Sequence, residues 1–241
     1  MKNRNKFIFD VDGTLTPSRG IIDLEFKTFF NAFCLENDVY LVTGSDKPKT
    51  IEQLGEDTYN LCKRVYNCSG CDVYEGNSNV RTSEWTLPQD AHTWLSEKLT
   101  ESNFNIRSGL HFEHRSGMVN FSIVGRNANT EQRAAYVTYE DTHSERYSIA
   151  QDFNALFPNL QATVGGDTGI DIAPRGADKS QILKDFDTSD TIHFYGDAMS
   201  EGGNDLPLAH ALKDFQLGFS HQVADWNHTW EKLHENFTNR T

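Results

Sequence analysis

Long apolar runs are missing from this sequence of 241 residues. No window approaches the roughly 18 apolar residues that a membrane-spanning helix needs. The first residues are basic, but the apolar stretch that begins at Phe7 soon meets aspartates and is too short for a secretory signal. The sequence therefore predicts no membrane partner and a cytoplasmic location.

Positive charge is also scarce. Lys and Arg together number 22, against 35 Asp and Glu, so the formal net charge is −13. Nucleic acid and anionic membrane surfaces would be repelled by such a chain. We therefore expect no nucleic-acid partner, and a local cluster of positive charge becomes informative because it runs against the background.

Cysteine is rare, with four residues in the chain and one C-x-x-C pair, Cys68 and Cys71. A zinc site would need further ligands at a suitable spacing, and none is obvious near this pair. A polar turn with reduced thiols is the favoured interpretation, and a metal site there is the less favoured one.

Apolar runs do occur in short form, and they alternate with helical patterns. Buried strands are predicted over residues 7–11 and 38–43, and helical spacing of apolar residues covers 24–34. This order is typical of a parallel α/β sheet. A further buried strand is predicted late in the chain, over residues 191–195.

The middle of the chain has a different pattern. Apolar and polar residues alternate within 104–124, which predicts short antiparallel strands, and strands are also expected near Ala162 and Ile170. Helices are predicted over 89–101, 129–139 and 145–156. A further helix is expected to begin after Asp178, and a last one is predicted over 224–237. The middle stretch is therefore interpreted as an α+β domain inserted into an α/β core.

Polar side chains follow three of the predicted parallel strands. Asp10 and Asp12 follow the first strand, Thr43 and Ser45 follow the second, and Asp197 follows the strand at 191–195. In parallel sheets, functional polar groups gather at the carboxyl ends of the strands. These side chains are therefore expected to share one edge of the sheet.

The residue types at this edge suit phosphoryl transfer. An aspartate can attack phosphorus, and a second carboxylate two residues later could protonate the leaving oxygen. Mg²⁺ takes carboxylate and phosphate oxygens as ligands. Lys179, together with a strand-end hydroxyl, could neutralise charge on the transferring group.

Residues 107–133 hold four arginines and no lysine: Arg107, Arg115, Arg126 and Arg133. The planar guanidinium binds phosphate oxygens in two directions, so this window predicts a phosphate site separate from Asp10. The alternative is a set of surface arginines paired with nearby carboxylates, namely Glu113, Glu131 and Glu140.

Two stretches resemble the haloacid dehalogenase-like phosphotransferase superfamily: "FDVDGTLT" at residues 9–16 and "FYGDAMSEGGNDLPLA" at residues 194–209. The resemblance implies Asp10 as nucleophile, Asp12 as general acid/base and Lys179 as the cation that steadies the phosphoryl group. It implies Mg²⁺ held by Asp10, the Asp12 carbonyl and Asp197. Support for the metal would come from Asn204 and Asp205.

A more specific resemblance covers nearly the whole chain. "HRSGMVNFSIVGRNANTEQR", residues 114–133, is similar to the cap segment of eukaryotic-type phosphomannomutases, and Arg115, Arg126 and Arg133 fall on the arginine positions of that family. Arg19 matches the arginine that follows the first motif. "VTGSDKPKTIEQLGED", residues 42–57, and "GGDTGIDIAPRGADKSQIL", residues 165–183, resemble two further segments.

This family resemblance implies a Rossmann-like parallel-sheet core over 1–81 and 178–241, with an inserted α+β cap over 82–177. It implies an enzyme that moves phosphate between C6 and C1 of mannose through a hexose 1,6-bisphosphate, with the phosphate carried on Asp10. It also implies a role in GDP-mannose biosynthesis and a homodimer paired through the caps. The implied substrate-binding residues are Arg19, Thr43, Ser45, Arg115, Met118, Arg126, Arg133 and Asp171.

One departure keeps an alternative open. Gly169 stands where the family usually has a serine beside the sugar phosphate, so one hydroxyl donor is missing. A phosphatase of the same superfamily, in which water attacks the aspartyl-phosphate, is therefore the second interpretation. A non-catalytic protein of this fold would be expected to lack Asp10, Asp12 or Asp197, and all three are present.

Overall fold

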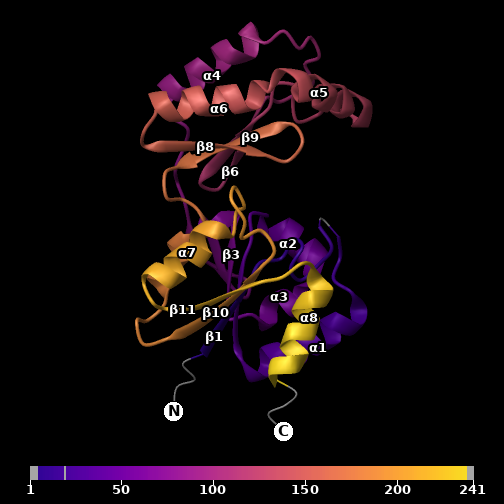
Figure 1. Cartoon of the computed structure of the whole chain (residues 1–241), viewed down its shortest axis with the longest axis vertical. Coiled ribbons are helices and arrows are strands. Elements are labelled where there is room, and N and C mark those ends of the chain that lie inside the picture. The colour runs from indigo at the N-terminus through magenta and orange to yellow at the C-terminus, as the bar shows by residue number, and fades with distance from the viewer. Residues whose placement is uncertain (1–4, 19, 238–241) are drawn as a thin grey trace. The chain divides into compact units, whose positions relative to one another are not determined.

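The computed structural model describes residues 5–18 and 20–237, and it divides the chain into two compact units. Unit 1 comprises Met1–Thr82 and Gly176–Thr241, and unit 2 comprises Ser83–Arg175. The predicted fold class is confirmed, since unit 1 is an α/β unit and unit 2 is an α+β unit that interrupts it in the sequence (Figure 1). Among the described residues, no helix is both long and apolar enough to cross a membrane.

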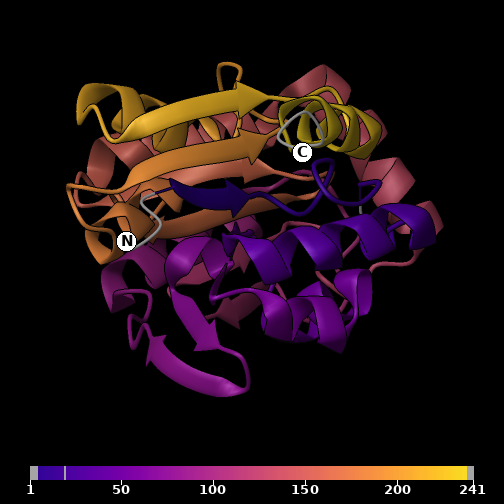
Figure 2. The same cartoon turned by 90° about the horizontal axis from the view of Figure 1, so that it is seen from below.

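The sheet of unit 1 has the order β11-β10-β1-β2-β3-β4-β5. The first five of these strands are parallel, and β4 and β5 add an antiparallel hairpin at one edge. Figure 2 shows β1, β10 and β11 side by side and pointing the same way. The strands are β1 (Asn5–Phe9), β2 (Asp38–Val42), β3 (Arg64–Asn67), β4 (Asp72–Glu75), β5 (Ser78–Thr82), β10 (Thr191–Gly196) and β11 (Gly218–Gln222).

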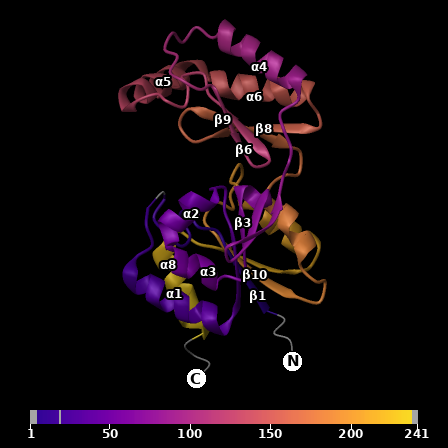
Figure 3. The same cartoon turned by 180° about the vertical axis from the view of Figure 1, so that it is seen from behind.

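Helices cover both faces of this sheet because the central strands are apolar on both sides. Phe7 and Phe9 pack with the aromatic residues of α1, α3 and α8, whereas Ile8 belongs to a second core with residues of α7 and η2. Figure 3 shows α1, α3 and α8 together on one side of the sheet. Such double burial is typical of a parallel sheet. The helices are α1 (Leu24–Glu36), α2 (Lys47–Leu54), α3 (Glu56–Leu61), α7 (Leu206–Asp214) and α8 (Trp226–Phe237), with 3₁₀ turns η1 (Cys68–Gly70) and η2 (Lys179–Asp185).

Unit 2 is an antiparallel sheet with helices on one face. The strand order is β6-β7-β9-β8, and the elements are β6 (Phe112–Arg115), β7 (Met118–Phe121), β8 (Leu160–Gly165), β9 (Gly169–Pro174), α4 (Gln89–Glu101), α5 (Thr130–His143) and α6 (Glu145–Leu156). Phe121, Ile170 and Ile172 join the core with the helices. By the period of two in a strand, Asn120 and Asp171 belong to the opposite face of the sheet.

Several predicted elements differ from the observed ones. The helices at 89–101 and 145–156 are confirmed, but the one expected at 129–139 extends to His143, with Asn129 as its N-cap. Within 104–124 only two four-residue strands form, and Leu110 is 65 % exposed. The segment after Asp178 is a 3₁₀ turn, and neither the short helix α3 nor the edge strand β11 was predicted.

Candidate active site

The carboxyl ends of β1, β2 and β10 meet in unit 1, as the strand pairing requires. Asp10 follows β1 directly, and its backbone N–H donates to the Tyr195 carbonyl of β10 at 2.9 Å. The chain then turns tightly through Gly13, whose φ is +80°. A Cβ at Gly13 would lie 2.3 Å from Asp197 Oδ2, so only glycine allows this approach of the first loop to Asp197.

Lys179 is the centre of the buried ion pairs. Its side chain is fully buried, and Nζ lies 2.5 Å from Asp10 Oδ1 and 2.7 Å from Asp205 Oδ1. Burial alone would lower the pKa of Lys179, but the two carboxylates raise it overall. The ammonium therefore stays charged, and Asp10 is held in one orientation before any substrate arrives.

Negative charge exceeds positive charge in this cluster. Burial raises the pKa of Asp10 to about 7; Lys179 opposes the rise, and the carboxylates of Asp205 and Asp197 add to it. Burial, followed by the charge of Asp205, also raises the pKa of Asp197. A group of three carboxylates, two of them buried, is incompletely neutralised by one lysine.

The same three carboxylates could hold a divalent cation. Asp10, Asp197 and Asp205 each offer an oxygen, and these atoms lie within 4.8 Å of one another. Carboxylate oxygens are ligands that Mg²⁺ prefers, and a cation would offset the excess charge, so the residues fit such an ion. The geometry adds Asp205 as a candidate ligand, whereas the family resemblance implied only a supporting role for it.

Asp12 is held by one side chain from the loop after β2 and one from α2. Gln53 Nε2 of α2 donates to Asp12 Oδ1 at 2.9 Å, and Ser45 Oγ donates to Asp12 Oδ2 at 3.4 Å. Thr43 is buried, and its hydroxyl accepts the Ser45 backbone N–H at 3.1 Å. The second strand end therefore orients the carboxylate that was expected to act as general acid/base.

The loop after β10 carries the remaining expected support. Asp205 Oδ2 accepts the Ala198 backbone N–H at 3.1 Å, and Asn204 Oδ1 lies 3.5 Å from Lys179 Nζ. A Cβ at Gly196 would lie 2.5 Å from Asp205 Oδ2, so glycine ends β10 where Asp205 folds back over it.

The arginines of unit 2 do not all behave alike. Arg115 Nη2 and Arg126 Nε both donate to Glu113 Oε2, at 2.9 and 2.5 Å, and all three side chains remain about a third exposed. Burial would raise the pKa of Glu113, but Arg115 and Arg126 lower it overall. The two arginines therefore converge on one carboxylate at an open surface.

Arg133 and Arg107 lie in different surroundings. Arg133 Nη2 is 3.7 Å from Asp167 Oδ2. Arg107 donates to the backbone carbonyls of Phe104, Ile106, Leu99 and Ser102, so it closes the end of α4. Three arginines of residues 107–133 thus pair with carboxylates, whereas Arg107 donates to backbone carbonyls instead.

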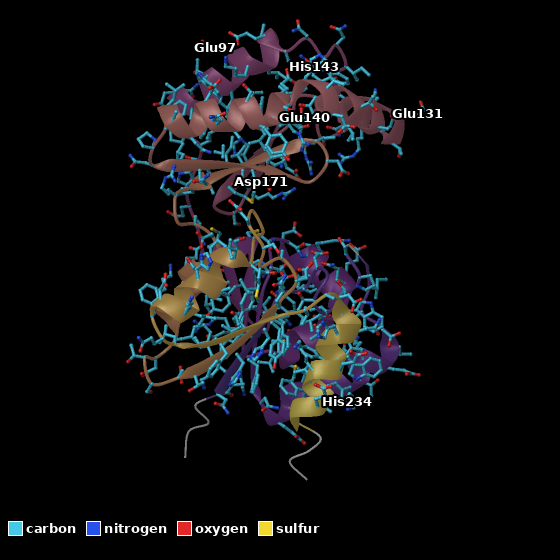
Figure 4. All side chains as sticks on the ribbon, viewed as in Figure 1. Glu97, Glu131, Glu140, His143, Asp171 and His234 are labelled. Carbon is cyan, nitrogen blue, oxygen red and sulfur yellow. The ribbon has the colours of Figure 1, made fainter. Side chains whose placement is uncertain are left out.

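Met118 and Asp171, both expected to bind the sugar, lie on the face of the unit 2 sheet opposite the helices. Asn120 of β7 lies opposite Asp171 of β9, and its Nδ2 donates to Asp171 Oδ1 at 2.6 Å. Met118 lies two residues before Asn120 on the same strand and therefore on the same face. Figure 4 shows Asp171 on the side of the sheet opposite the helices.

The comparisons with known proteins cover almost the whole chain. The model of the family described as eukaryotic phosphomannomutase matches residues 26–239. The chain belongs to this family. Phosphomannomutases of Glycine max and Saccharomyces cerevisiae are 31 % and 32 % identical to it over 231 and 234 residues, which cover 90 % of this chain and 90 % and 89 % of theirs.

Solved structures show the fold at lower identity. A haloacid dehalogenase-like hydrolase from Bacteroides thetaiotaomicron has a TM-score of 0.60 at 13 % identity and covers 98 % of this chain and 100 % of its own. A trehalose-6-phosphate phosphatase related protein has a TM-score of 0.58 at 15 % identity, with 98 % of both chains covered. This chain therefore shares its fold with these two proteins.

The phosphomannomutase motifs led to most of these residues, but sequence reasoning missed two that hold them. Gln53 orients Asp12, and Asn120 orients Asp171. Glu113 was expected as an arginine partner and joins two arginines. A signal for Gln53 existed, because a polar residue at a buried helix position three residues after Thr50 needs a partner. Arg19, also expected from the family, lies outside the described residues.

Gly169, where the chain departs from the phosphomannomutase pattern, has no space beside it for a side chain. A Cβ at Gly169 would lie 2.5 Å from Asn120 Nδ2. Asn120 therefore fills the space that a serine side chain would enter. A serine here would have to displace the group that orients Asp171.

Proposed function

We propose that this protein is a phosphomannomutase that interconverts mannose 6-phosphate and mannose 1-phosphate. The observation that carries the proposal is the arrangement of three side chains in unit 1. Asp10 pairs with the fully buried Lys179, and Asp12, two residues after Asp10, is oriented by Gln53. Membership of the eukaryotic phosphomannomutase family supports the choice of sugar.

In the first half of the reaction, a carboxylate oxygen of Asp10 attacks the phosphorus of a hexose 1,6-bisphosphate. A bond forms between Asp10 and phosphorus, and the bond from phosphorus to the sugar oxygen breaks. Asp12 gives a proton to that oxygen, which leaves as a hydroxyl. Lys179 offsets the negative charge on the transferring group from a position that is fixed before the reaction.

In the second half, the phosphate moves from Asp10 to the free C6 hydroxyl of mannose 1-phosphate. Asp12 takes the proton of that hydroxyl, whose oxygen attacks the phospho-aspartate, and the carboxylate of Asp10 is restored. The bisphosphate that forms turns end for end, and Asp10 removes its C1 phosphate by the first half-reaction, which leaves mannose 6-phosphate. In each transfer, the phosphate at the other end of the sugar needs its own site. We assign that site to Arg115, Arg126 and Arg133, with Arg19 as an expected fourth arginine, and assign the sugar hydroxyls to Asp171 and the sugar ring to Met118.

We propose Mg²⁺ as the cation and Asp10, Asp197, Asp205 and the Asp12 carbonyl as its candidate ligands. When bound, Mg²⁺ would polarise the phosphoryl oxygens and neutralise developing charge. Asn204 would help to hold the loop that carries Asp205. A hexose 1,6-bisphosphate as activator, a homodimer formed through unit 2, a cytoplasmic location and a supply of mannose 1-phosphate to GDP-mannose biosynthesis belong to the same proposal.

Phosphorus NMR of the purified protein tests this function. The sample contains Mg²⁺, mannose 1-phosphate and a trace of glucose 1,6-bisphosphate. A growing mannose 6-phosphate signal with little inorganic phosphate is the expected result. Inorganic phosphate as the sole product would instead identify a phosphatase, the alternative that the missing serine at Gly169 leaves open.

A further inference from the structure

Unit 2 contains a buried ion pair that lies outside the proposed substrate-binding set. Glu140 of α5 and Arg146 of α6 have side chains only 6 % and 9 % exposed, and Arg146 Nε lies 3.3 Å from Glu140 Oε1. The backbone N–H of Arg146 also donates to both carboxylate oxygens of Glu140, at 3.1 and 3.2 Å. Glu140 therefore binds the first turn of α6 as well as the guanidinium.

Stability alone gives a weak reason for such a pair. Removing two charges from water costs several kcal/mol, and apolar side chains of similar size often serve a core equally well. A buried guanidinium is better explained by the particular groups to which it donates, because its planar fork holds them in a fixed geometry.

Those groups lie in and beside the turn between β8 and β9. Arg146 Nη1 donates to the Gly166 carbonyl at 2.8 Å and lies 3.4 Å from the Gly169 carbonyl. Ser122 Oγ, itself buried, donates to the Thr168 carbonyl at 2.9 Å. Hairpin turns normally lie at the surface with carbonyls bonded to water, whereas this one is held from the inside.

The two glycines that flank this turn lie against the Asn120–Asp171 pair. Gly165 and Gly169 are register partners, and a Cβ on them would lie 2.5 Å from Asp171 Oδ2 and from Asn120 Nδ2 respectively. The backbone at the base of the turn therefore closes on the two polar side chains without space to spare. A small displacement of the turn would have to move the carboxylate of Asp171.

We propose that Arg146, held by Glu140, is a positioning residue that fixes the β8–β9 turn and thereby the orientation of Asp171 toward the sugar. This inference rests on the proposed function, in which Asp171 binds sugar hydroxyls. Figure 4 shows the two ends of this chain of contacts, with Glu140 on the helical layer and Asp171 on the sheet.

The test compares Arg146→Met with Arg175→Met. Arg175 is a matched control because it also donates to two carbonyls, Pro158 at 2.8 Å and Leu160 at 3.3 Å, but at the opposite end of the same strand pair. With mannose 1-phosphate as substrate, Arg146→Met is expected to raise KM about tenfold or more, because small misplacements of binding groups are costly. Arg175→Met should leave KM within about twofold.

A second readout is independent of catalysis. The Asn120 side-chain amide, assigned in ¹⁵N-labelled protein with Asn120→Ala, reports its short bond to Asp171 as a downfield proton signal. This signal should move upfield in Arg146→Met and stay unchanged in Arg175→Met. If wild-type protein has no mutase activity, the proposed function fails, and this signal alone decides the positioning role.

Two further variants test the proposal if Arg146→Met does not fold. Arg146→Lys keeps the charge opposite Glu140 but loses the fork, and Glu140→Gln keeps the shape but loses the charge. Both should raise KM and move the Asn120 signal in the same direction, by less than Arg146→Met does. Equal effects in the Arg146 and Arg175 variants, or an unmoved Asn120 signal in every Arg146 and Glu140 variant, would overturn the proposal.

Discussion

The two candidate phosphate-handling regions are built on opposite principles. In unit 1, Lys179 and Asp205 are fully buried, charge is net negative, and the side chains hold one another in place. In unit 2, Arg115 and Arg126 are about a third exposed, and both depend on the one carboxylate of Glu113. Groups that react need a fixed geometry before substrate binds, whereas groups that grip a phosphate need only a partner that the phosphate can replace.

The largest effect is expected from Asp10→Asn. The amide cannot attack phosphorus, so mutase activity should fall by at least about 10⁴-fold. Phosphorus NMR of mannose 6-phosphate formation measures this loss. Asp38→Asn is the matched control, because Asp38 also pairs with a buried lysine, Lys6 at 2.6 Å, but at the amino end of the sheet. Equal losses in both variants would remove Asp10 from its assigned role.

Arg126→Gln is expected to have a smaller effect than Asp10→Asn, and to weaken substrate binding more than the chemical step. Loss of a guanidinium that binds phosphate costs the energy of a charged hydrogen bond, so KM for mannose 1-phosphate should rise about 10- to 100-fold, with a smaller change in kcat. Arg107→Gln is the control, since Arg107 comes from the same window but donates to backbone carbonyls. A fall in kcat at constant KM would contradict the assignment of Arg126 to substrate binding.

An intermediate effect is expected from Gln53→Leu, which tests preorganisation in unit 1. Gln53 is fully buried and its Nε2 orients Asp12, so a leucine should lower kcat about tenfold and leave KM nearly unchanged. Thr50→Val is the control, because Thr50 lies on the same buried helix face and bonds Asn67 instead. A Gln53→Leu enzyme with the kcat of the Thr50→Val enzyme would show that Asp12 needs no such support.

In unit 1, the sequence predicts the reactive groups better than the side chain that orients one of them. The strand ends that carry Asp10, Thr43 and Asp197 are visible because buried strands are short apolar runs that stop on polar residues. The bond from Gln53 to Asp12 spans 41 residues, and no periodicity encodes a partner at that distance.

In unit 2, the arginine spacing was visible, but the sharing of Glu113 depends on where the loop after β7 brings Arg126. The same holds for Arg146, because a charged residue in an amphipathic helix is read as solvent-facing until the packing shows it buried. Sequence patterns therefore located the reactive groups better than the residues that hold them.

The smallest effect concerns the edge of the unit 1 sheet. Burial lowers the pKa of His221 to about 4 from its ordinary value of 6.5, helped by the charges of His193 and Lys232. His221 stacks on Tyr195 at 4.5 Å, and its Nε2 lies 3.3 Å from His193 Nδ1. Because His221 binds a proton more readily in the unfolded chain, its contribution to folding stability is complete above pH 6.5 and is lost as the pH falls toward 4.

The partial exposure of His221 screens the effect, so the loss should amount to about 1 kcal/mol. Urea unfolding at pH 7.5 and pH 5 measures it as the difference between wild type and His221→Phe, which keeps the aromatic contact without the titration. The phenylalanine variant should lose less stability on acidification, while its kcat and KM at pH 7.5 stay those of the wild type. A pH dependence identical in both proteins would place the acid sensitivity of unit 1 in its carboxylate cluster instead.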